Sequence, residues 1–568
     1  MRARPRRSQL DIGLPVLVIL ATAAAFWPVL GNQFVNWDDP DVLLRNAQLG
    51  NPGLLRWAFT TGLIGHYQPL SWLVWSAVKS AFGLSSSAFH GLSLVAHLAN
   101  GVLVYMLAQR LARAADVSSG QARIVAAVAA FTFAVHPLRV EPVAWASAMP
   151  YVVSLSLTLV TVIAYVNGFL VWSLVSYALA LLTRASAIGL PLVLLLIDFY
   201  PLRRTRSTSL WRLAIEKIPF AALAIGAAVA EALTRDAVSL GEIGLGARLT
   251  MAVTAPFEYV GRTLLPVQLT PLSVLPISPV TDWVRLTIGI AALVVVTIAG
   301  WTLRKTRPVV IVCWLAFLVL LAPVAGLTPS GVQATADRYT YVPGVAISIL
   351  LGALIARLNA SDRPRRALMI PVAAVVVALS VMTWRQTQYW HDSIALWTRA
   401  ADLDPRNDIA TYNLAIAYAD TGRETEAIDW YERTIALVPD HDLARQNLAL
   451  LNAARAEREG NQLAEAGRAD EAIAQYTKAL ALDGKRLHAR AARGVLLARR
   501  GRFQEAIVEL RAALAGGAAD PEVANSLAYA LVQTGNEQEA AAVLSDAVAA
   551  HPGDVNLKRN LERLRAGR

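Results

Sequence analysis

Long apolar runs recur along the first two thirds of the chain and constrain its fold more than any other feature. We count eleven of them, near residues 10–30, 89–112, 124–141, 143–166, 168–186, 187–201, 213–233, 284–303, 308–327, 341–357 and 367–384. About 20 apolar residues are enough for a helix to cross the hydrocarbon core of a bilayer. The pattern therefore predicts an all-α protein whose N-terminal part, residues 1–385, is a polytopic membrane helical bundle of about 11 spans.

Composition supports a membrane protein. Of 568 residues, 55% are hydrophobic and only 16% are charged, and the mean hydropathy is +0.45. Soluble domains carry roughly 25% charged residues. The single cysteine, Cys313, excludes disulfides within the chain and cysteine-based zinc sites.

Arginine-rich segments predict how the bundle is oriented. With eleven spans they fall on one side, which the positive-inside rule makes cytoplasmic. These segments are residues 1–7, 110–123, 203–206, 304–307 and 357–366. The net charge of +11 is explained by these loops, so no nucleic-acid partner is expected. The run at 250–265 carries Glu258 and Arg262, so we expect a re-entrant or interfacial helix there.

A cluster of acids follows the first apolar run. Residues 1–385 hold fifteen of the 41 acids, and three of these are Asp38, Asp39 and Asp41. One interpretation is a solvated loop in which aspartate serves as a turn residue. The other is an active-site loop on the outer face. The three carboxylates also leave open a divalent cation, which prefers such oxygen ligands. No other cofactor is predicted.

Further polar residues are expected on the same face. A sugar transfer from a lipid phosphate to a hydroxyl needs a base at the acceptor oxygen and a cation at the leaving phosphate. We predict Asp38 or Asp39 as the base and Arg338 and Arg184 as phosphate partners. The residues predicted to orient the base or the acceptor are His136, Glu141, Tyr67 and His66. The alternatives are lipid-headgroup anchoring for Arg338 and a structural hydrogen-bonded role for His66 and His136.

The composition changes after residue 385, and an internal repeat appears. Gly467, Gly501 and Gly535 are 34 residues apart, and each opens a segment of the type Gly-x-x-x-Glu-Ala. Gly422 lies 45 residues before Gly467, which is one period plus an insertion near 447–458. This pattern resembles the tetratricopeptide repeat (TPR). We therefore predict that residues 386–568 form an extracytoplasmic α-solenoid whose groove binds protein.

Short motifs in the N-terminal part resemble a known family when taken in order. They are Phe34-x-Asn-Trp-Asp-Asp39, Tyr67-x-Pro-Leu70, Phe89-His-Gly-Leu-x-Leu-x-x-His-Leu-x-Asn100, His136-Pro-x-x-x-Glu-x-Val-x-Trp145 and Arg338-Tyr-x-Tyr-x-Pro343. Together with the repeats they resemble the transmembrane-and-TPR protein O-mannosyltransferases, which are GT-C class glycosyltransferases. The resemblance implies that Asp38 and Asp39 are catalytic and that the donor is a polyprenyl-phosphate-linked sugar. One departure is Thr183-Arg184-Ala185, where the family tends to have Ser-Lys-Glu.

The sequence thus predicts an integral-membrane glycosyltransferase. It would move mannose or another hexose from the lipid donor to a protein hydroxyl at the outer face, with the repeats binding the acceptor. The Ala- and Arg-rich composition is typical of a bacterial inner-membrane protein. The alternative is a catalytically inactive membrane anchor that carries a TPR scaffold for extracytoplasmic protein assembly. A transporter is disfavoured because the charges cluster at span ends rather than at the midplane.

Overall fold

The computed structural model describes residues 10–234, 243–275, 281–327, 333–359, 366–518 and 520–566. It forms two compact units, residues 1–413 and residues 414–568, called here the N-terminal and C-terminal units. The predicted boundary lay at residues 385 and 386. The arginine cluster at residues 1–7 and much of the arginine-rich loop at 357–366 lie outside the described residues.

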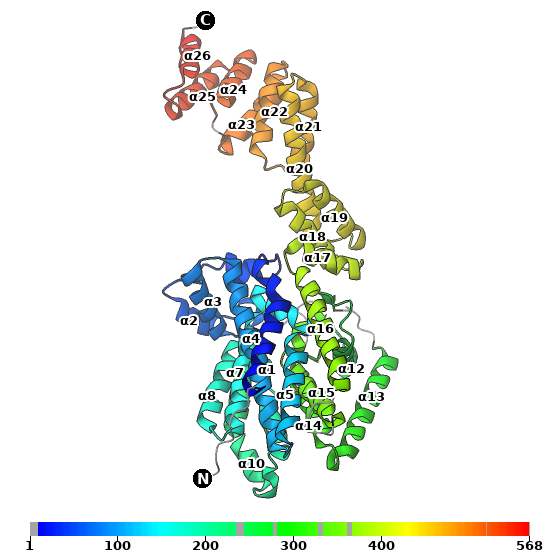
Figure 1. Cartoon of the computed structure of the whole chain (residues 1–568). Helices are drawn as coiled ribbons and strands as arrows, with labels where there is room; N and C mark the ends of the chain where they lie inside the picture. The colour runs from blue at the N-terminus through cyan, green and yellow to red at the C-terminus, as the bar shows by residue number, and fades with distance from the viewer. Residues whose placement is uncertain are drawn as a thin grey trace. The chain divides into compact units, whose positions relative to one another are not determined.

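The N-terminal unit is almost entirely helical (Figure 1). Its α-helices are α1 (Leu10–Phe26), α2 (Leu54–Thr60), α3 (Pro69–Phe82), α4 (Ser86–Ala114), α5 (Ser119–Ala134), α6 (Val140–Ala144), α7 (Met149–Val166), α8 (Leu170–Thr183), α9 (Leu190–Phe199), α10 (Leu210–Glu216), α11 (Ile218–Thr234), α12 (Leu245–Leu264), α13 (Trp283–Thr302), α14 (Pro308–Leu321), α15 (Gly344–Leu358), α16 (Arg366–Gln388) and α17 (Ser393–Leu403). A short antiparallel pair joins β1 (Ser273–Val274) to β2 (Gln333–Thr335).

Five helical segments are long and apolar enough to cross a membrane, or up to seven if two bent pairs each count as one span. The five are Ile12–Gly31, Ser86–Ala114, Ala146–Val166, Trp283–Lys305 and Ala367–Gln388. Four predicted spans appear as shorter apolar helices: Leu170–Thr183, Leu190–Phe199, Pro308–Val324 and Gly344–Leu358. The rise of about 1.5 Å per residue makes these shorter than a hydrocarbon core of about 30 Å. A bundle of eleven full spans therefore stays a prediction. Helix α12, at the predicted re-entrant segment, is not among the spanning candidates.

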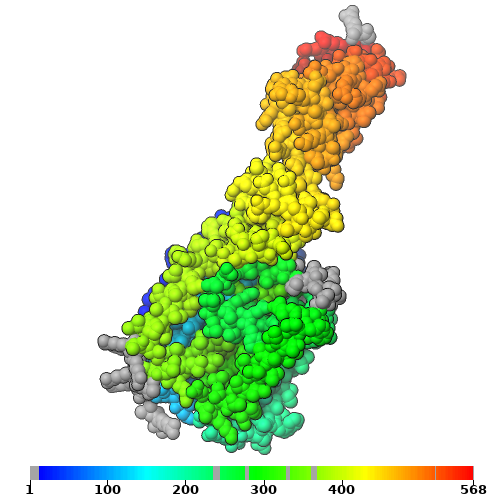
Figure 2. All heavy atoms as spheres, turned by 90° about the vertical axis from the view of Figure 1, so that its right-hand side faces the viewer, coloured from blue at the N-terminus to red at the C-terminus, as the bar shows by residue number. Residues whose placement is uncertain are grey.

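Apolar side chains cover much of the outside of the N-terminal unit. Helix α13 lies at its edge in Figure 1 and faces the viewer in Figure 2. Trp283, Val284 and Ile288 on this helix are each more than 60% exposed. Exposed apolar area of this extent marks an interaction surface, and lipid is one such partner.

A network of buried hydrogen bonds links the central helices of the N-terminal unit. His97 on α4 donates from Nε2 to the carbonyl of Ala134 (2.9 Å), and its Nδ1 accepts from the hydroxyl of Tyr341 (2.6 Å). Asn100, one turn along α4, donates to the carbonyl of Val152 (2.9 Å). These bonds tie α4 to α5, to α7 and to the segment before α15. His97 and Asn100 of the sequence motif thus have structural partners.

The repeats continue through the C-terminal unit as paired helices. The helices are α18 (Asp408–Asp420), which crosses the unit boundary, α19 (Glu424–Leu437), α20 (Asp442–Glu465), α21 (Ala469–Leu482), α22 (Leu487–Arg499), α23 (Phe503–Ala515), α24 (Pro521–Gln533), α25 (Glu537–Ala550) and α26 (Val555–Arg565). Gly422, Gly467, Gly501 and Gly535 have φ of 74° to 79°, which glycine adopts without steric cost. Each directly precedes a second helix of a pair, as the sequence predicted.

The insertion in the repeats is helical. Helix α20 has 24 residues, whereas α22 and α24 have 13 each, so it is 11 residues longer. This matches the extra spacing between Gly422 and Gly467, because 45 minus 34 is also 11. Eleven residues make about three turns of 3.6 residues. The extra turns therefore lengthen α20 while its packing faces keep their direction.

Candidate active site around Asp38

The acidic loop is fixed by contacts with a segment far away in the sequence. Trp37 stacks on Trp145, with ring centroids 4.7 Å apart, and lies 5.1 Å from the ring of Trp397. Asn36 donates from Nδ2 to the carbonyl of Asn413 (3.0 Å) and accepts from Trp397 Nε1 (2.6 Å). Its backbone N–H donates to Ser393 Oγ (2.9 Å). These contacts all lie within the N-terminal unit, and they place the acidic pair in a defined position.

Asp39 is fully buried and both of its carboxylate oxygens are engaged. Oδ2 accepts from the backbone N–H of Val35 (2.9 Å), and Oδ1 accepts from both the backbone N–H (3.0 Å) and the hydroxyl of Ser147. Burial raises the pKa of Asp39 to about 6, although these hydrogen bonds act in the opposite direction. Asp39 thus stabilises the acidic loop through Val35 and connects the loop to Ser147 by hydrogen bonds.

Asp38 is half-buried, and no described residue forms a hydrogen bond or ion pair with its carboxylate. Burial raises its pKa, while Arg338 and Arg184 are near enough to lower it in part. The two members of the predicted pair therefore differ. No described residue pairs with the oxygens of Asp38, which lie within the electrostatic influence of two arginines, whereas both oxygens of Asp39 already accept hydrogen bonds.

Arg184 is held by neutral groups. Its guanidinium donates to Gln68 Oε1 (3.1 Å), to His66 Nε2 (3.0 Å) and to the hydroxyl of Tyr151 (2.9 Å). Because an arginine can only donate, His66 accepts at Nε2 and donates from Nδ1 to Glu231 (2.7 Å). No carboxylate among the described residues forms an ion pair with Arg184. The pKa of His66 is lowered to about 4 by burial and by the charge of Arg184, so His66 is neutral at pH 7.

Arg338 lies buried and paired. Its guanidinium forms an ion pair with Glu141 and also donates to Gln333. Its backbone N–H donates to the second oxygen of Glu141 (2.9 Å). The guanidinium carbon lies 5.3 Å from the ring of Trp145 and 5.0 Å from that of Tyr339. Glu141 thus positions Arg338 rather than an acceptor in this structure.

Two buried donors beside the arginines have no hydrogen-bond partner among the described residues. They are Nε2 of Gln68, whose Oε1 accepts from Arg184, and Nε1 of the Trp145 ring next to Arg338. Buried donors are rarely left unpaired in folded proteins. A ligand rich in acceptor oxygens, such as a phosphate, would satisfy both. We call Asp38, Arg184, Arg338, Gln68 and Trp145 the Asp38 site.

The other predicted residues have structural surroundings. His136 accepts from the backbone N–H of Leu138 (3.2 Å) and donates to the carbonyl of Thr263 (2.9 Å), so both ring nitrogens are engaged. The backbone N–H of Tyr67 donates to Glu231 (3.1 Å). Asp41 is 61% exposed and pairs with Arg45 (2.7 Å).

Asp38, Asp39 and Asp41 do not gather into a cation site. Among the described residues there is no group of three or more His, Cys, Asp or Glu side chains able to hold a metal ion. The reason is geometric, because Asp39 turns into the protein and Asp41 turns outward to Arg45. The structure does not support the divalent cation that the three acids left open.

Several contributors to the site and its surroundings were not predicted as site residues, besides Trp145 and Gln333. They are Glu231, Gln68, Tyr151 and Ser147. Glu231 had a usable signal, since an acid near the end of an apolar run is costly without a function or a partner. The others carry no local signal, because their roles depend on which helices pack together.

Comparison with known proteins identifies the repeats. Residues 384–442 and 457–521 match one tetratricopeptide-repeat family model, and residues 497–564 match another. No curated protein matches the chain.

Solved structures with similar repeats cover a third of the chain or so. MamA from AMB-1 is 24% identical, covers 29% of this chain and 85% of its own, and has a TM-score of 0.19. YrrB, described as a TPR protein with an unusual peptide-binding site, is 18% identical, covers 34% and 91%, and has a TM-score of 0.19. TTC0263, a thermophilic TPR protein in Thermus thermophilus, is 20% identical, covers 35% and 98%, and has a TM-score of 0.16.

These features define the class of the molecule. It is an all-helical chain in which an N-terminal unit with apolar helices precedes tetratricopeptide repeats. Such repeats form scaffolds that bind protein partners. The family models leave the N-terminal unit, where the Asp38 site lies, without a match up to residue 383.

Proposed function

We propose that this chain is a membrane glycosyltransferase that moves a sugar from a polyprenyl-phosphate donor to a hydroxyl of a protein acceptor. The observation that carries the proposal is the free carboxylate of Asp38 beside two arginines. Perturbed titratable groups that lie together with unpaired donors are typical of functional sites. The resemblance of the motifs to the protein O-mannosyltransferases supports the choice of donor and acceptor.

The chemistry is a single displacement with inversion. Asp38 takes the proton from the acceptor hydroxyl as its oxygen bonds to the anomeric carbon of the sugar. The bond between that carbon and the phosphate oxygen breaks, and the electron pair leaves with the polyprenyl phosphate. Arg184 and Arg338 stabilise the negative charge that develops on this phosphate. Asp39 keeps the loop in place, and His66 and Glu141 position the arginines.

The repeats would hold the acceptor. A groove of about 560 Å³ in the C-terminal unit is lined by apolar and polar side chains, including Tyr476, His488, Arg499 and Glu522. Mixed linings of this kind suit an extended polypeptide. Under the orientation predicted from the arginine-rich segments, donor and acceptor would meet at the outer membrane face.

The test is donor turnover by purified protein in lipid. Radiolabelled polyprenyl-phosphate sugars are incubated with the protein and a membrane-protein extract, and release of sugar from the lipid is followed. We expect turnover by the wild type and a loss of at least about a hundredfold in Asp38→Asn, since a positioned base contributes roughly 10² to 10⁴ in rate. The matched control is Asp41→Asn, which removes the same charge from the same loop at an exposed position and should keep full turnover.

A second function, an inactive membrane anchor for the repeats, is favoured by two observations. Ala185 replaces the acid of the related motif, and the guanidinium of Arg338 is already occupied by Glu141 and Gln333. The two functions separate in a strain that lacks the gene. If full-length Asp38→Asn restores the phenotype as well as the wild type does, the scaffold function holds. If Asp38→Asn fails while Asp41→Asn succeeds, the enzyme function holds.

A further inference from the structure

A pocket lies in the N-terminal unit, away from the Asp38 site. Its volume is about 250 Å³, and helix ends surround it: the C-terminal ends of α4, α9 and α15 and the N-terminal ends of α5 and α14. A cavity of roughly 150 Å³ already admits a benzene molecule, so this one has room for part of an aliphatic chain. Its walls are mainly aliphatic, with Leu111, Val125, Val312 and Ile349 among them.

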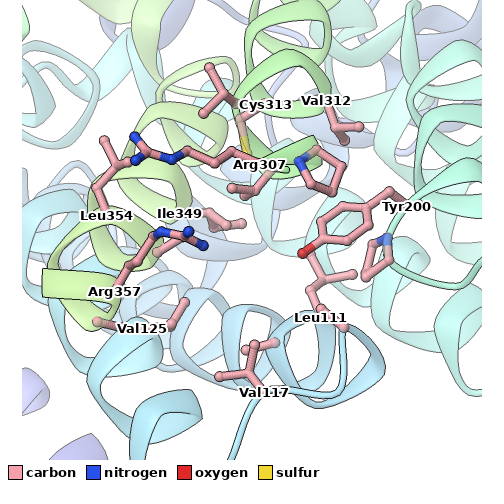
Figure 3. A pocket seen from close by; sticks show the side chains of 18 of the residues that line it. Leu111, Val117, Val125, Tyr200, Arg307, Val312, Cys313, Ile349, Leu354 and Arg357 are labelled. Atoms are coloured by element: carbon pink, nitrogen blue, oxygen red, sulfur yellow. The ribbon is translucent and has the colours of Figure 1, made fainter. Parts of the chain in front are cut away.

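The mouth of this pocket is cationic. Arg307 and Arg357 belong to its lining, and Figure 3 shows their guanidinium groups beside each other on one side, with Tyr200 opposite. The described part of the lining contains no carboxylate, and no described residue forms an ion pair with either arginine. The pocket therefore combines an apolar interior with two arginines that form no ion pair with any residue the structure describes.

A smaller apolar cavity adjoins this pocket. This second cavity, of about 90 Å³, shares Leu111, Ile197, Val312, Cys313 and Ile349 with it. This cavity extends along α15 as far as Val342 and Val345, at the end of the helix opposite to Arg357. Helix α15 has 15 residues, so its ends lie about 22 Å apart. We call these two adjoining cavities, which share part of their lining, the apolar path; Arg307 and Arg357 line one end of it.

We propose that this path binds an anionic glycerophospholipid, with its phosphate between Arg307 and Arg357 and an acyl chain in the apolar interior. Arginine suits a phosphodiester because its planar fork donates two parallel hydrogen bonds. Basic pockets between helices on the cytoplasmic side are known places for anionic headgroups. Both arginines belong to segments that the positive-inside pattern makes cytoplasmic, which is the face opposite to the Asp38 site.

The proposal needs the chain to lie in a membrane, but it does not need the transferase activity. A lipid seated here would hold α4, α9, α14 and α15 together from one side. Three of these, α9, α14 and α15, are apolar helices that are too short to span the bilayer. The two arginines favour a lipid with an anionic headgroup, because a neutral headgroup would not balance their positive charge.

The test measures lipid binding to full-length protein that has been purified and stripped of lipid in detergent. Phosphatidylglycerol, phosphatidylcholine, polyprenyl phosphate and inorganic phosphate are added separately, and bound molecules are counted by native mass spectrometry. We expect phosphatidylglycerol to bind with preference over phosphatidylcholine. The double variant R307Q/R357Q should weaken this binding about 30-fold, given the usual contribution of each basic residue. The matched control R304Q/K305Q removes two cations from the neighbouring loop that do not line the pocket, and should bind as the wild type does.

A third variant separates a pocket from a charged surface. Ala353 lines the cavity, and Ala353→Trp fills it while both arginines remain. We expect this variant to lose phosphatidylglycerol binding and to keep the helix content of the wild type by circular dichroism. Retained binding in Ala353→Trp, equal loss in the R304Q/K305Q control, or preference for polyprenyl phosphate or free phosphate would each overturn the proposal. Asp38→Asn should bind the lipid normally, so failure of the proposed transferase leaves this result unaffected.

Discussion

Asp38 and Asp39 carry the same side chain and share one loop, yet their surroundings give them different chemistry. Asp39 is buried, and both of its oxygens already accept hydrogen bonds from Val35 and Ser147. Asp38 lies one residue away with a free carboxylate and a raised pKa. A base that must be ionised to act, and whose pKa is raised by burial, loses activity as the pH falls toward that pKa.

Replacement of Asp39 by asparagine should reduce stability. In the wild type, the donors of Val35 and Ser147 all find a carboxylate oxygen. In the variant, one of these oxygens is replaced by an amide NH₂ group, which cannot accept, so at least one buried donor is left unpaired. The expected cost is about 1–3 kcal/mol, the usual penalty for such a group. Thermal unfolding of purified Asp39→Asn at pH 7 measures this cost against Asp41→Asn, whose exposed carboxylate should be dispensable. Equal melting temperatures for both variants would show that the Asp39 hydrogen bonds do not stabilise the fold.

His66 should make stability depend on pH in the acidic range. Its pKa is lowered from 6.5 to about 4 in the folded protein, so the unfolded chain binds more protons between these values. Stability therefore falls as the pH is lowered from 6.5 to 4, by about 3 kcal/mol from this residue. Gln in place of His66 can still donate to Glu231 and accept from Arg184 but cannot titrate.

The measurement is a melting series over pH 4 to 7. His66→Gln should show a shallower loss of melting temperature toward low pH than the wild type, because one titrating group has been removed. If both proteins lose melting temperature in parallel, the His66 ring is not held neutral by its surroundings.

At the scale of elements, helix α20 shows how an insertion can be accommodated within a repeat. Helix α19 precedes it, α21 follows it, and each packs against it. Eleven extra residues turn the helix through about three full turns, so both contacts use compatible faces. An insertion of another length would rotate one contact away from the other.

This predicts a length-dependent response to deletion. Removal of residues 448–458 leaves 13 residues in α20, the length of α22, and keeps the direction of its faces. Removal of the nine residues 448–456 rotates the helix after the cut by about half a turn, at about 100° per residue. Limited proteolysis of the full-length variants compares them: we expect the 11-residue deletion to resist cleavage near α20 and the nine-residue deletion to be cut. Equal cleavage of both would mean that helix phase does not govern this packing.

For the whole molecule, sequence reasoning worked where the signal was local and periodic. The 34-residue spacing located the turn glycines and the second helices. It did so because each turn requires a left-handed backbone conformation, which glycine adopts without steric cost. The apolar runs located most of the long helices of the N-terminal unit, but they missed α2 and α3. The number of helices that cross a membrane was not settled by these runs, because α8 and α9 end where the backbone becomes extended at Arg184 and Tyr200.

Three residues of the Asp38 site, Asp38, Arg184 and Arg338, were predicted from the sequence, but their arrangement was not. Arg338 and Glu141 are 197 positions apart, and Asp39 and Ser147 are 108 apart. Pairings over such separations depend on how helices pack, and a single sequence carries no record of them. For the same reason the different states of Asp38 and Asp39, which are adjacent and identical in type, could be distinguished only in the folded chain.

The stacking of Trp37 on Trp145, close to Trp390 and Trp397, has an optical consequence. Indole rings at these separations couple their electronic transitions, so the group should give a distinct near-ultraviolet circular dichroism band and a self-quenched emission. The residue next to Asp38 thus carries a built-in spectroscopic reporter. Binding of a ligand at Asp38, or displacement of the loop, can therefore be followed by tryptophan fluorescence or circular dichroism. This measurement needs no label and no knowledge of the substrate.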